Sequence, residues 1–585
     1  MAYYNLDPCH FITAADLTWN ARLNYTKAEL ELFTDVNMYL RIEDNIRGGI
    51  CYVGKRYSCC NNRFVPETYD VKREETYIIA VDANNLYGYT MTQSLPISNF
   101  KILTASEIKD FNVFNLSAND DVGYFLEVDL LYPPELHDLH DFPLAPDHTV
   151  IQFDMLSRYQ KKLIENHGIK FSKQNRKLTP SFHTKYNYVV HYLNLKFYLE
   201  KGMVLQKIHN ILSFRQKPWL KPYVIFNNDK RQSTKHPFER DLFKLMNNAW
   251  FGKSLQNPRK RLQIEGAFTL KQCQKKLSSP LLENFEIINE EFSVFKMTKK
   301  NLCLDKLIYI GFTILELSKL HMYNLYYDYL KKNYKNKCSL LYTDTDSLYL
   351  EIRAPNVYTD LKTKFNSIMD LSNFPTDHEL FSSENKGILG ALKCETTSPI
   401  KEFIALKCKM YCLVHGDESK KTAKGVKKEQ VKRFTADQYK SVLNDKLFLR
   451  HQQQNITTKH HSIETVKQNK LSLTPFYDKN FIQDDGIRCL PYDLLHFRHV
   501  LVLNSHAAIS VGVQVPFAAV SALVLEQSAS GEGPEELLMS GEQARGMVAL
   551  KEQQRGTLLG QDAPEGERGE APRRIRGGHP QQAKQ

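Results

Sequence analysis

The chain has 585 residues, a formal net charge of +12 and a pI near 8.9. A chain of this length can form several subdomains around a large core, and its positive charge suits a polyanionic partner whose binding weakens as salt rises. Eleven cysteines without a paired C-x-x-C framework, together with the lack of a signal peptide, argue against a disulfide-stabilised secreted protein and predict a reducing compartment.

The first strongly predicted strand spans residues 76–81, an apolar and β-prone run. It ends at Asp82, and turn-forming residues up to Gly88 follow. A carboxylate at the end of a buried strand is well placed to hold a metal ion. The alternative is an aspartate that ends the strand and only caps the next turn.

Residues 239–253 predict an amphipathic helix. The helical wheel groups its side chains on two faces, an apolar face with Leu242, Leu245, Met246 and Ala249 and an opposite face with Arg240, Lys244, Asn248 and Phe251. The second face suits an incoming nucleotide, because cations pair with phosphates and an aromatic ring can stack under a base. A solvated basic face on a surface helix is the alternative.

Residues 307–329 predict a second amphipathic helix, which would pack beneath a sheet. His321 falls on this helix, and we assign it a core or surface position rather than a ligand role.

Residues 339–352 predict two strands joined by a tight acidic turn that contains Asp344 and Asp346. Two carboxylates this close repel each other unless a cation joins them, and Mg²⁺ is suitable because substrate phosphates complete its shell. Asp82 and Asp346 would then supply the shared ligands of a two-metal site for phosphoryl transfer, with Asp344 as a further oxygen donor. Ordinary turn chemistry is the alternative.

These segments resemble the polymerase motifs of family B DNA polymerases. Asp82-Ala-Asn-Asn-Leu-Tyr-Gly resembles motif A (D-x-x-S-L-Y-P), and Lys244-x-x-x-Asn248-Ala-Trp-Phe251-Gly resembles motif B (K-x-x-x-N-S-x-Y-G). Tyr342-Thr-Asp-Thr-Asp-Ser matches motif C (Y-x-D-T-D-S) without a departure. Lys409-Met-Tyr411 fits the K-x-Y element, and Arg47-Gly48-Gly49 resembles the Y-x-G-G/A element. The forms of motifs A and B are similar to those of the protein-primed branch of viruses and Polinton/Maverick-type transposons.

The resemblance implies a role for each matching position. The implied catalytic residues and metal ligands are Asp82, Asp344 and Asp346, with two Mg²⁺ ions that Mn²⁺ can replace. The implied nucleotide-binding residues are Tyr87, Lys244, Asn248, Phe251 and Arg240, where the Tyr87 ring excludes a ribose 2′-hydroxyl. The implied primer- and template-binding residues are Lys409, Tyr411, Gly48, Gly49 and Lys253. Phe251 stands where the motif has tyrosine, so a hydrogen bond from that hydroxyl is absent.

The implied fold is α+β, a right-hand polymerase with an antiparallel palm sheet, helical fingers and a thumb. We expect the exonuclease remnant and linker in residues 1–75, the first part of the palm with an insertion in 76–204, the fingers in 205–257, a second insertion in 258–303, the second part of the palm in 304–425 and the thumb in 426–495. The implied partners are a DNA template-primer, dNTPs and a terminal protein that supplies the priming hydroxyl, in the nucleus or at a viral replication site. The residues themselves leave the source of that hydroxyl open.

Two features favour a rival interpretation, a catalytically inactive DNA-binding remnant of a mobile element. Residues 1–75 are too few for a 3′–5′ exonuclease domain, so we expect no proofreading activity. Residues 496–585 have a composition that predicts a disordered or foreign tail. Within this tail, residues 507–525 are uncharged and mostly apolar, but Gln514 and Pro516 weaken a membrane span there, and we expect no membrane partner. A reverse transcriptase is disfavoured by the D-T-D turn and by the order of the motifs.

Overall fold

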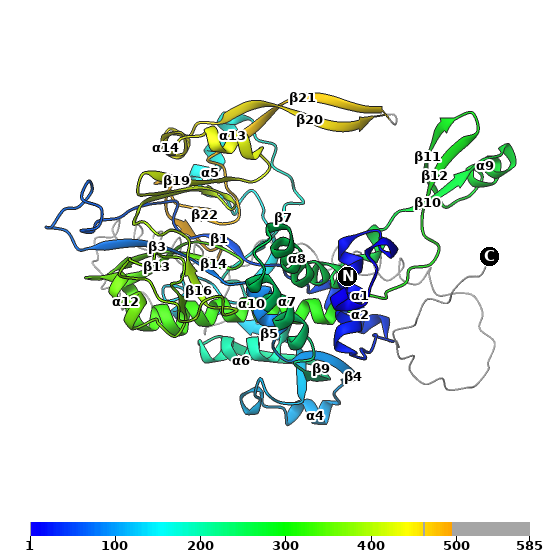
Figure 1. Cartoon of the computed structure of the whole chain (residues 1–585), viewed down its shortest axis with the longest axis horizontal. Coiled ribbons are helices and arrows are strands. Elements are labelled where there is room, and N and C mark those ends of the chain that lie inside the picture. The colour runs from blue at the N-terminus through cyan, green and yellow to red at the C-terminus, as the bar shows by residue number, and fades with distance from the viewer. Residues whose placement is uncertain (1, 460–461, 494–585) are drawn as a thin grey trace, which may run out of the picture. The chain divides into compact units, whose positions relative to one another are not determined.

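The computed structural model describes residues 2–459 and 462–493, and it mixes helices and sheets throughout, as the α+β prediction requires (Figure 1). The predicted tail from residue 496, including the apolar run 507–525, lies outside the described residues. Within the described part of the chain, no helix is both long and apolar enough to cross a membrane. All eleven cysteines are free thiols.

A six-stranded sheet forms the centre of the fold. Its strands are, in spatial order, β1 (Cys51–Val53), β13 (Cys338–Asp344), β14 (Ser347–Arg353), β3 (Thr76–Ala83), β16 (Leu392–Cys394) and β15 (Met369–Asp370). The predicted acidic hairpin is confirmed, because β13 and β14 pair antiparallel on either side of a short turn. β14 also pairs antiparallel with β3, so the first predicted strand and the hairpin belong to one sheet. β3 is almost continuously buried, which explains its unbroken apolar run.

The second predicted helix is α10 (Ile308–Asn324), which continues into a π-helical segment at Leu325–Lys331. The prediction of an amphipathic helix is wrong, because α10 is buried on nearly all sides. It contacts the helices α2 (Val36–Asp44), α3 (Leu86–Met91), α6 (Tyr192–Glu200) and α8 (Pro237–Ser254) and the strands β4 (Leu95–Ile102) and β8 (Lys185–His191). A helix surrounded in this way has no face left for solvent.

A second sheet contacts the central one through strands far apart in the sequence. Its strands are, in order, β19 (Glu418–Ala423), β18 (Met410–His415), β17 (Ile400–Lys407) and β2 (Tyr57–Cys59). The segment that follows contains α13 (Lys428–Arg433), α14 (Ala436–Asn444), the long ribbon of β20 (Leu449–Lys459) and β21 (Ser462–Leu473), and the short pair β22 (Phe481–Ile482) and β23 (Cys489–Leu490) (Figure 1).

The region between β3 and the next long helices contains a four-stranded sheet, with strands in the order β4, β9 (Val204–Lys217), β5 (Val122–Leu131) and β8. Its remaining elements are α4 (Ala105–Lys109), β6 (Asp147–Val150), α5 (Arg158–His167) and β7 (Arg176–Thr179). β9 occupies the start of the segment expected to form the fingers, so the helices there begin only with α7 (Lys221–Ser233).

A small unit lies in the segment expected to be the second insertion. It consists of a three-stranded sheet, β10 (Gln263–Ala267), β12 (Phe292–Met297) and β11 (Leu282–Asn289), with the helix α9 (Leu270–Leu277) (Figure 1). Two further short helices complete the described chain, α11 (Lys332–Tyr334) and α12 (Val357–Thr363).

α8 is the predicted nucleotide-facing helix, and its buried face differs from the prediction. The buried stripe runs through Phe243, Met246, Asn247, Trp250 and Ser254, whereas Leu245 is 40% exposed. α8 packs against both α7 and α1 (Ala14–Thr26), and the two bulky aromatic rings fill the space between these helices. Larger aromatic surfaces gain more from burial than leucine, which explains the rotation of the helix relative to the prediction.

Arg22 of α1 is fully buried at this three-helix contact. Its guanidinium carbon lies 4.0 Å from the ring of Trp19, 4.8 Å from that of Trp250 and 5.5 Å from that of Trp219. None of its three side-chain nitrogens has a hydrogen-bond partner among the described residues. Burial therefore lowers the pKa of the Arg22 guanidinium to about 9, because the charged form loses its hydration.

We expect Arg22→Met to increase the free energy of unfolding by about 2 kcal/mol at pH 7, because desolvating an unpaired guanidinium costs more than the cation–π contacts offset. The lowered pKa gives the sign of the pH dependence. The free-energy cost of burying the charged guanidinium is complete below about pH 9 and decreases above it. The stability gained by Arg22→Met should therefore be smaller at pH 10 than at pH 7. Urea denaturation followed by circular dichroism measures this difference. The exposed Arg158→Met is the matched control, expected within about 0.5 kcal/mol of wild type, and a less stable Arg22→Met protein would contradict the prediction.

Candidate functional site

The three predicted aspartates gather at one end of the central sheet. β13 ends at Asp344, and the turn residue Thr345 has a φ of 71°, which is unusual for a β-branched side chain. The Thr345 amide donates to the Ile50 carbonyl at 2.7 Å, and this bond holds the turn. Asp82 lies opposite Ser347 in the β3–β14 pairing, and the Ala83 amide donates to the Asp346 carbonyl at 2.7 Å.

The carboxyl groups of Asp82 and Asp346 both have raised pKa values. Burial, followed by the charges of Asp346 and Glu395, raises the pKa of Asp82 to about 7, while Lys420 and Lys244 oppose that shift. The pKa of Asp346 is also raised, first by burial, with further contributions from Asp344 and Glu395. Within the described residues, neither carboxylate forms an ion pair. A nearby positive charge would favour the ionised form of both carboxylates.

Asp344 differs from its neighbours because it already has a cationic partner. Lys409 forms an ion pair with its carboxylate, and the Tyr342 hydroxyl donates to it at 3.2 Å. The Lys409 amide in turn donates to the Tyr342 hydroxyl at 3.1 Å. Tyr411 is buried beneath the hairpin, where its hydroxyl lies 2.9 Å from that of Tyr349. Lys409 is thus at the carboxylates, whereas Tyr411 supports the sheet from below.

Gly48 and Gly49 pass directly beside the turn. A Cβ atom on Gly49 would lie 2.4 Å from the Thr345 hydroxyl oxygen, so a larger residue would displace the turn. No neighbour approaches the corresponding position on Gly48, which is exposed. The next residues enter β1, where Cys51 lies opposite Asp344.

Tyr87 of α3 and Phe251 of α8 join the segment that follows β3 to α8. Their rings stack at a centroid distance of 4.6 Å and an interplanar angle of 28°. Tyr87 follows the N-cap Asn85, whose side chain accepts a hydrogen bond from the Gly88 amide. Burial, followed by the charges of Asp346 and Asp344, raises the pKa of Tyr87 to about 12. Tyr87 is therefore close enough to the acidic end of the sheet for its hydroxyl to sense those charges.

The remaining predicted residues of α8 are divided between two environments. Arg240 and Lys244 are exposed, and the charge of Lys244 contributes to lowering the pKa of Asp82. The Asn248 side-chain oxygen is buried and has no hydrogen-bond partner among the described residues. Lys253 forms an ion pair with Asp16 of α1, so the structure places it away from the carboxylates.

Sequence inspection missed two charged residues at this site, Glu395 and Lys420. The Glu395 amide donates to the Ala80 carbonyl at 2.9 Å, which sets its side chain beside β3. Lys420 of β19 forms an ion pair with Glu395 and also interacts with Asp82. The pairing of β16 with β3 gives the position of Glu395, and the ion pair with Glu395 gives that of Lys420.

The donor set fits Mg²⁺ held together with a substrate. No group of three or more His, Cys, Asp or Glu side chains able to hold a metal ion occurs in residues 2–459 and 462–493. Mg²⁺ is usually bound by one or two carboxylates and by substrate phosphates rather than by a cage made only of protein. Asp82 and Asp346 supply two such carboxylates, and burial together with neighbouring negative charge raises the pKa of each.

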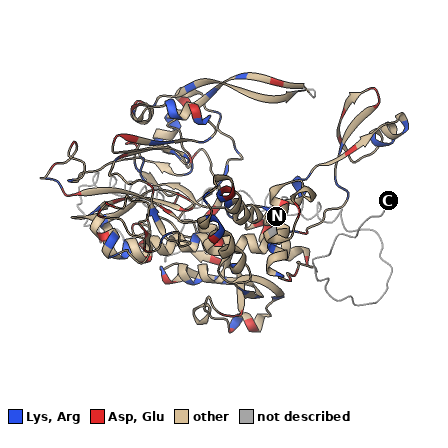
Figure 2. Cartoon of the chain, viewed as in Figure 1, with Lys and Arg blue, Asp and Glu red and all other residues tan. Residues whose placement is uncertain are grey.

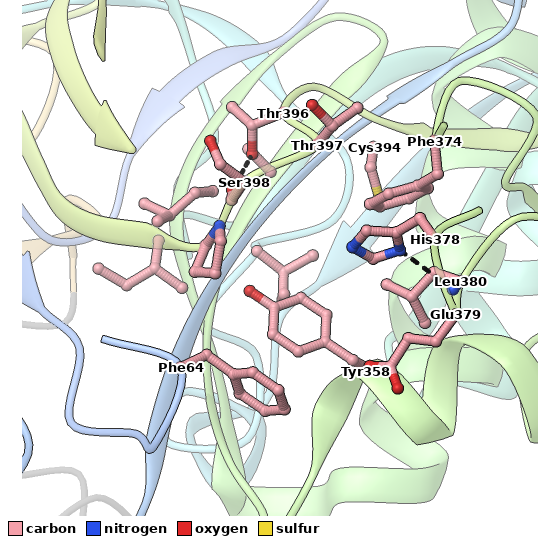
Figure 3. Close-up of a pocket in the computed structure, with 15 residues that line it drawn as sticks. Phe64, Tyr358, Phe374, His378, Glu379, Leu380, Cys394, Thr396, Thr397 and Ser398 are labelled. Atoms are coloured by element: carbon pink, nitrogen blue, oxygen red, sulfur yellow. Dashed lines mark hydrogen bonds between the residues drawn. The ribbon is translucent and has the colours of Figure 1, made fainter. Parts of the chain in front are cut away.

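Two other features do not locate the site. Lys and Arg are interspersed with Asp and Glu along most elements, so charge alone is not informative (Figure 2). A cavity of about 60 Å³ lies along β3, lined by Phe64, Tyr358, Phe374 and His378 among others (Figure 3). This volume suffices for a few water molecules and is far below that of a nucleotide pocket.

Comparison with known proteins finds similarity in structure but none in sequence. Neither protein-family models nor curated protein sequences match the chain. Phi29 DNA polymerase bound to primer-template DNA is similar in structure at 14% identity and a TM-score of 0.46, over 79% of this chain and 68% of that one. Its orthorhombic crystal form gives 13% identity and a TM-score of 0.47, with the same coverage. Its complex with single-stranded DNA gives 14% identity and a TM-score of 0.46, over 79% of this chain and 67% of that one. TM-scores below 0.5 do not establish a common fold.

We expect Asp82→Asn to stabilise the protein in chelator-treated buffer at pH 8, by roughly 2 kcal/mol. The folded-state pKa of about 7 lies above the ordinary value of 3.8, so ionisation of Asp82 is disfavoured in the folded protein. The free-energy cost of ionising Asp82 in the folded protein is absent below about pH 4 and complete above about pH 7. The stability gained by Asp82→Asn should therefore vanish in acid. Thermal denaturation across this pH range measures it. The exposed Asp377→Asn serves as the matched control, and equal melting temperatures for Asp82→Asn and wild type at pH 8 would refute the prediction.

Proposed function

We propose that this chain is a DNA-directed DNA polymerase that adds deoxynucleotides to a primer 3′-hydroxyl by nucleotidyl transfer. One observation carries the proposal. Asp82 of β3 and Asp346, in the turn before the adjacent strand β14, are far apart in the sequence but are both half-buried carboxylates with raised pKa values and no ion-pair partner among the described residues. The motif resemblance of these two positions supports the same chemistry.

Each residue of the site has a part in this proposal. Divalent ions, when bound, lower the pKa of the primer hydroxyl and neutralise charge on the departing pyrophosphate. Asp82 and Asp346 would hold them, and Lys409 would keep Asp344 from adding an uncompensated charge. The exposed cations Arg240 and Lys244 would pair with the triphosphate.

The stacked rings of Tyr87 and Phe251 would contact the sugar and base of the nucleotide. Phe251 holds one face of the Tyr87 ring, so the Tyr87 ring cannot retreat from an added 2′-hydroxyl on that side. We further infer, from the resemblance to the protein-primed branch, that a protein hydroxyl can supply the primer in replication of a viral or transposon genome. Transfer of labelled dNMP to a protein hydroxyl in the absence of a DNA primer tests that inference.

Primer extension on a templated DNA hairpin with Mg²⁺ and dNTPs tests the main proposal. We expect extension by the wild-type protein and a loss of about 10³-fold or more in Asp346→Ala, because the metal supplies several kcal/mol of transition-state stabilisation. Asp377→Asn should extend as wild type does. Folded protein that binds the hairpin but extends nothing would favour the inactive DNA-binding remnant instead.

We expect Tyr87→Ala to lower the discrimination between dNTPs and rNTPs by about 10²-fold, since removing the ring opens space for the 2′-hydroxyl. Tyr87→Phe keeps the ring and should keep the discrimination. The ratio of kcat/KM for a matched dNTP and rNTP measures the effect. Unchanged discrimination in an active Tyr87→Ala enzyme would show that another group excludes the ribose.

A further inference from the structure

Below the segment that carries Gly48 and Gly49 lies a buried ion pair on α10. The Lys319 ammonium and the Glu316 carboxylate are 3.0 Å apart, and their side chains are 2% and 0% exposed. Removing both charges from water costs several kcal/mol, and an apolar pair of similar volume would often be at least as stable. The pair therefore calls for an explanation other than stability.

The Lys319 ammonium donates two hydrogen bonds to backbone carbonyls and forms an ion pair with a carboxylate. It faces the Glu316 carboxylate and donates to the Leu315 carbonyl at 2.9 Å and to the Arg47 carbonyl at 3.0 Å. An ammonium group donates and does not accept, so these three oxygen-bearing groups restrict where the Lys319 side chain can lie. Lys319 thus fixes the backbone carbonyl of the residue that immediately precedes Gly48.

The side chain of Arg47 is held as firmly as its carbonyl. Its guanidinium donates to the Val189 carbonyl at 2.9 Å, to the Asn45 side chain at 2.8 Å and to Asp147 at 3.1 Å. The same group lies 3.6 Å from the centre of the Tyr188 ring. Both the backbone carbonyl and the side chain of Arg47 are therefore fixed, which sets the direction of the backbone into Gly48.

A short stretch of chain connects this anchor to the aspartates. Gly49 abuts the Thr345 side chain, and the Ile50 carbonyl accepts the hydrogen bond from the Thr345 amide. Thr345 stands between Asp344 and Asp346, in a backbone conformation that needs such support. Displacement of the Arg47 carbonyl would therefore shift the turn that carries two of the three carboxylates.

We propose that Lys319, held by Glu316, is a positioning residue for the aspartate turn. It acts through the Arg47 carbonyl and the Gly49–Thr345 contact, and it touches neither substrate nor metal. The inference rests on the proposed polymerase function for its kinetic readout, while metal binding gives a readout independent of that function.

The double variant Glu316→Leu/Lys319→Met tests the proposal without leaving a charge unpaired in the core. We expect a melting temperature close to that of wild type, since apolar side chains replace the ion pair. We expect kcat for extension to fall about 10- to 100-fold and the Mg²⁺ concentration for half-maximal rate to rise about 10-fold, as for other groups that orient metal ligands. Thr313→Val is the matched control, because Thr313 is buried on the same helix and bonds only to the Tyr309 carbonyl.

Titration with Mn²⁺ followed by electron paramagnetic resonance separates the two proposals. Weaker Mn²⁺ binding in the folded double variant supports the positioning role, even if the wild-type protein binds Mn²⁺ through Asp346 but extends no primer. Wild-type Mn²⁺ affinity and kcat in the double variant would overturn it. A wild-type protein without Asp346-dependent Mn²⁺ binding would overturn both proposals.

A second variant applies if the double variant does not fold. Gly49→Ala pushes on Thr345 and leaves the buried pair intact, so it should reproduce the loss of Mn²⁺ affinity. Unchanged Mn²⁺ affinity in folded Gly49→Ala would show that the turn is insensitive to this segment and would also overturn the proposal.

Discussion

The register of β3 against β14 is the constraint on which the candidate site depends. In this register Ser347 lies opposite Asp82, and the Asp346 carbonyl accepts a hydrogen bond from the Ala83 amide. A shift by one residue would turn the Asp82 side chain to the other face of the sheet and separate the two carboxylates. The long apolar run of β3 fixes the register, because its side chains fit the buried layers on both sides of the strand.

Charge at this end of the sheet is balanced unevenly. Four carboxylates meet there, and two of them have a cation of their own, Asp344 with Lys409 and Glu395 with Lys420. Asp82 and Asp346 have none within the described residues, and their pKa values are raised accordingly. Ionisation of these two carboxylates therefore costs the folded protein part of its stability.

The sequence allowed prediction of those parts of the fold that depend on short, continuous patterns. The strand before Asp82 and the hairpin around Asp344 and Asp346 follow from apolar runs bounded by turn residues, whereas their presence in one sheet is implied only by the motif resemblance. The Gly49–Thr345 contact, the Tyr87–Phe251 stack and the Lys409–Asp344 ion pair join segments whose motifs were recognised, but only the fold gives their geometry.

What escaped prediction depends on partners distant in the sequence. The rotation of α8 follows from the space between α1 and α7, which Phe243 and Trp250 fill better than Leu245 does. The burial of α10 on all sides likewise reflects its neighbours and not its own periodicity. Glu395 reaches the site only because β16 pairs with β3, and a local pattern does not encode that pairing.

The setting of Arg22 has a spectroscopic consequence. The sequence contains three tryptophans, and all three surround this one guanidinium where α1, α7 and α8 meet. Indole emission from the protein therefore originates in a single helical unit. Motion of that unit would alter the emission directly. The protein therefore carries an intrinsic fluorophore at the helix that contains Lys244 and Phe251, and no added label is needed to follow it.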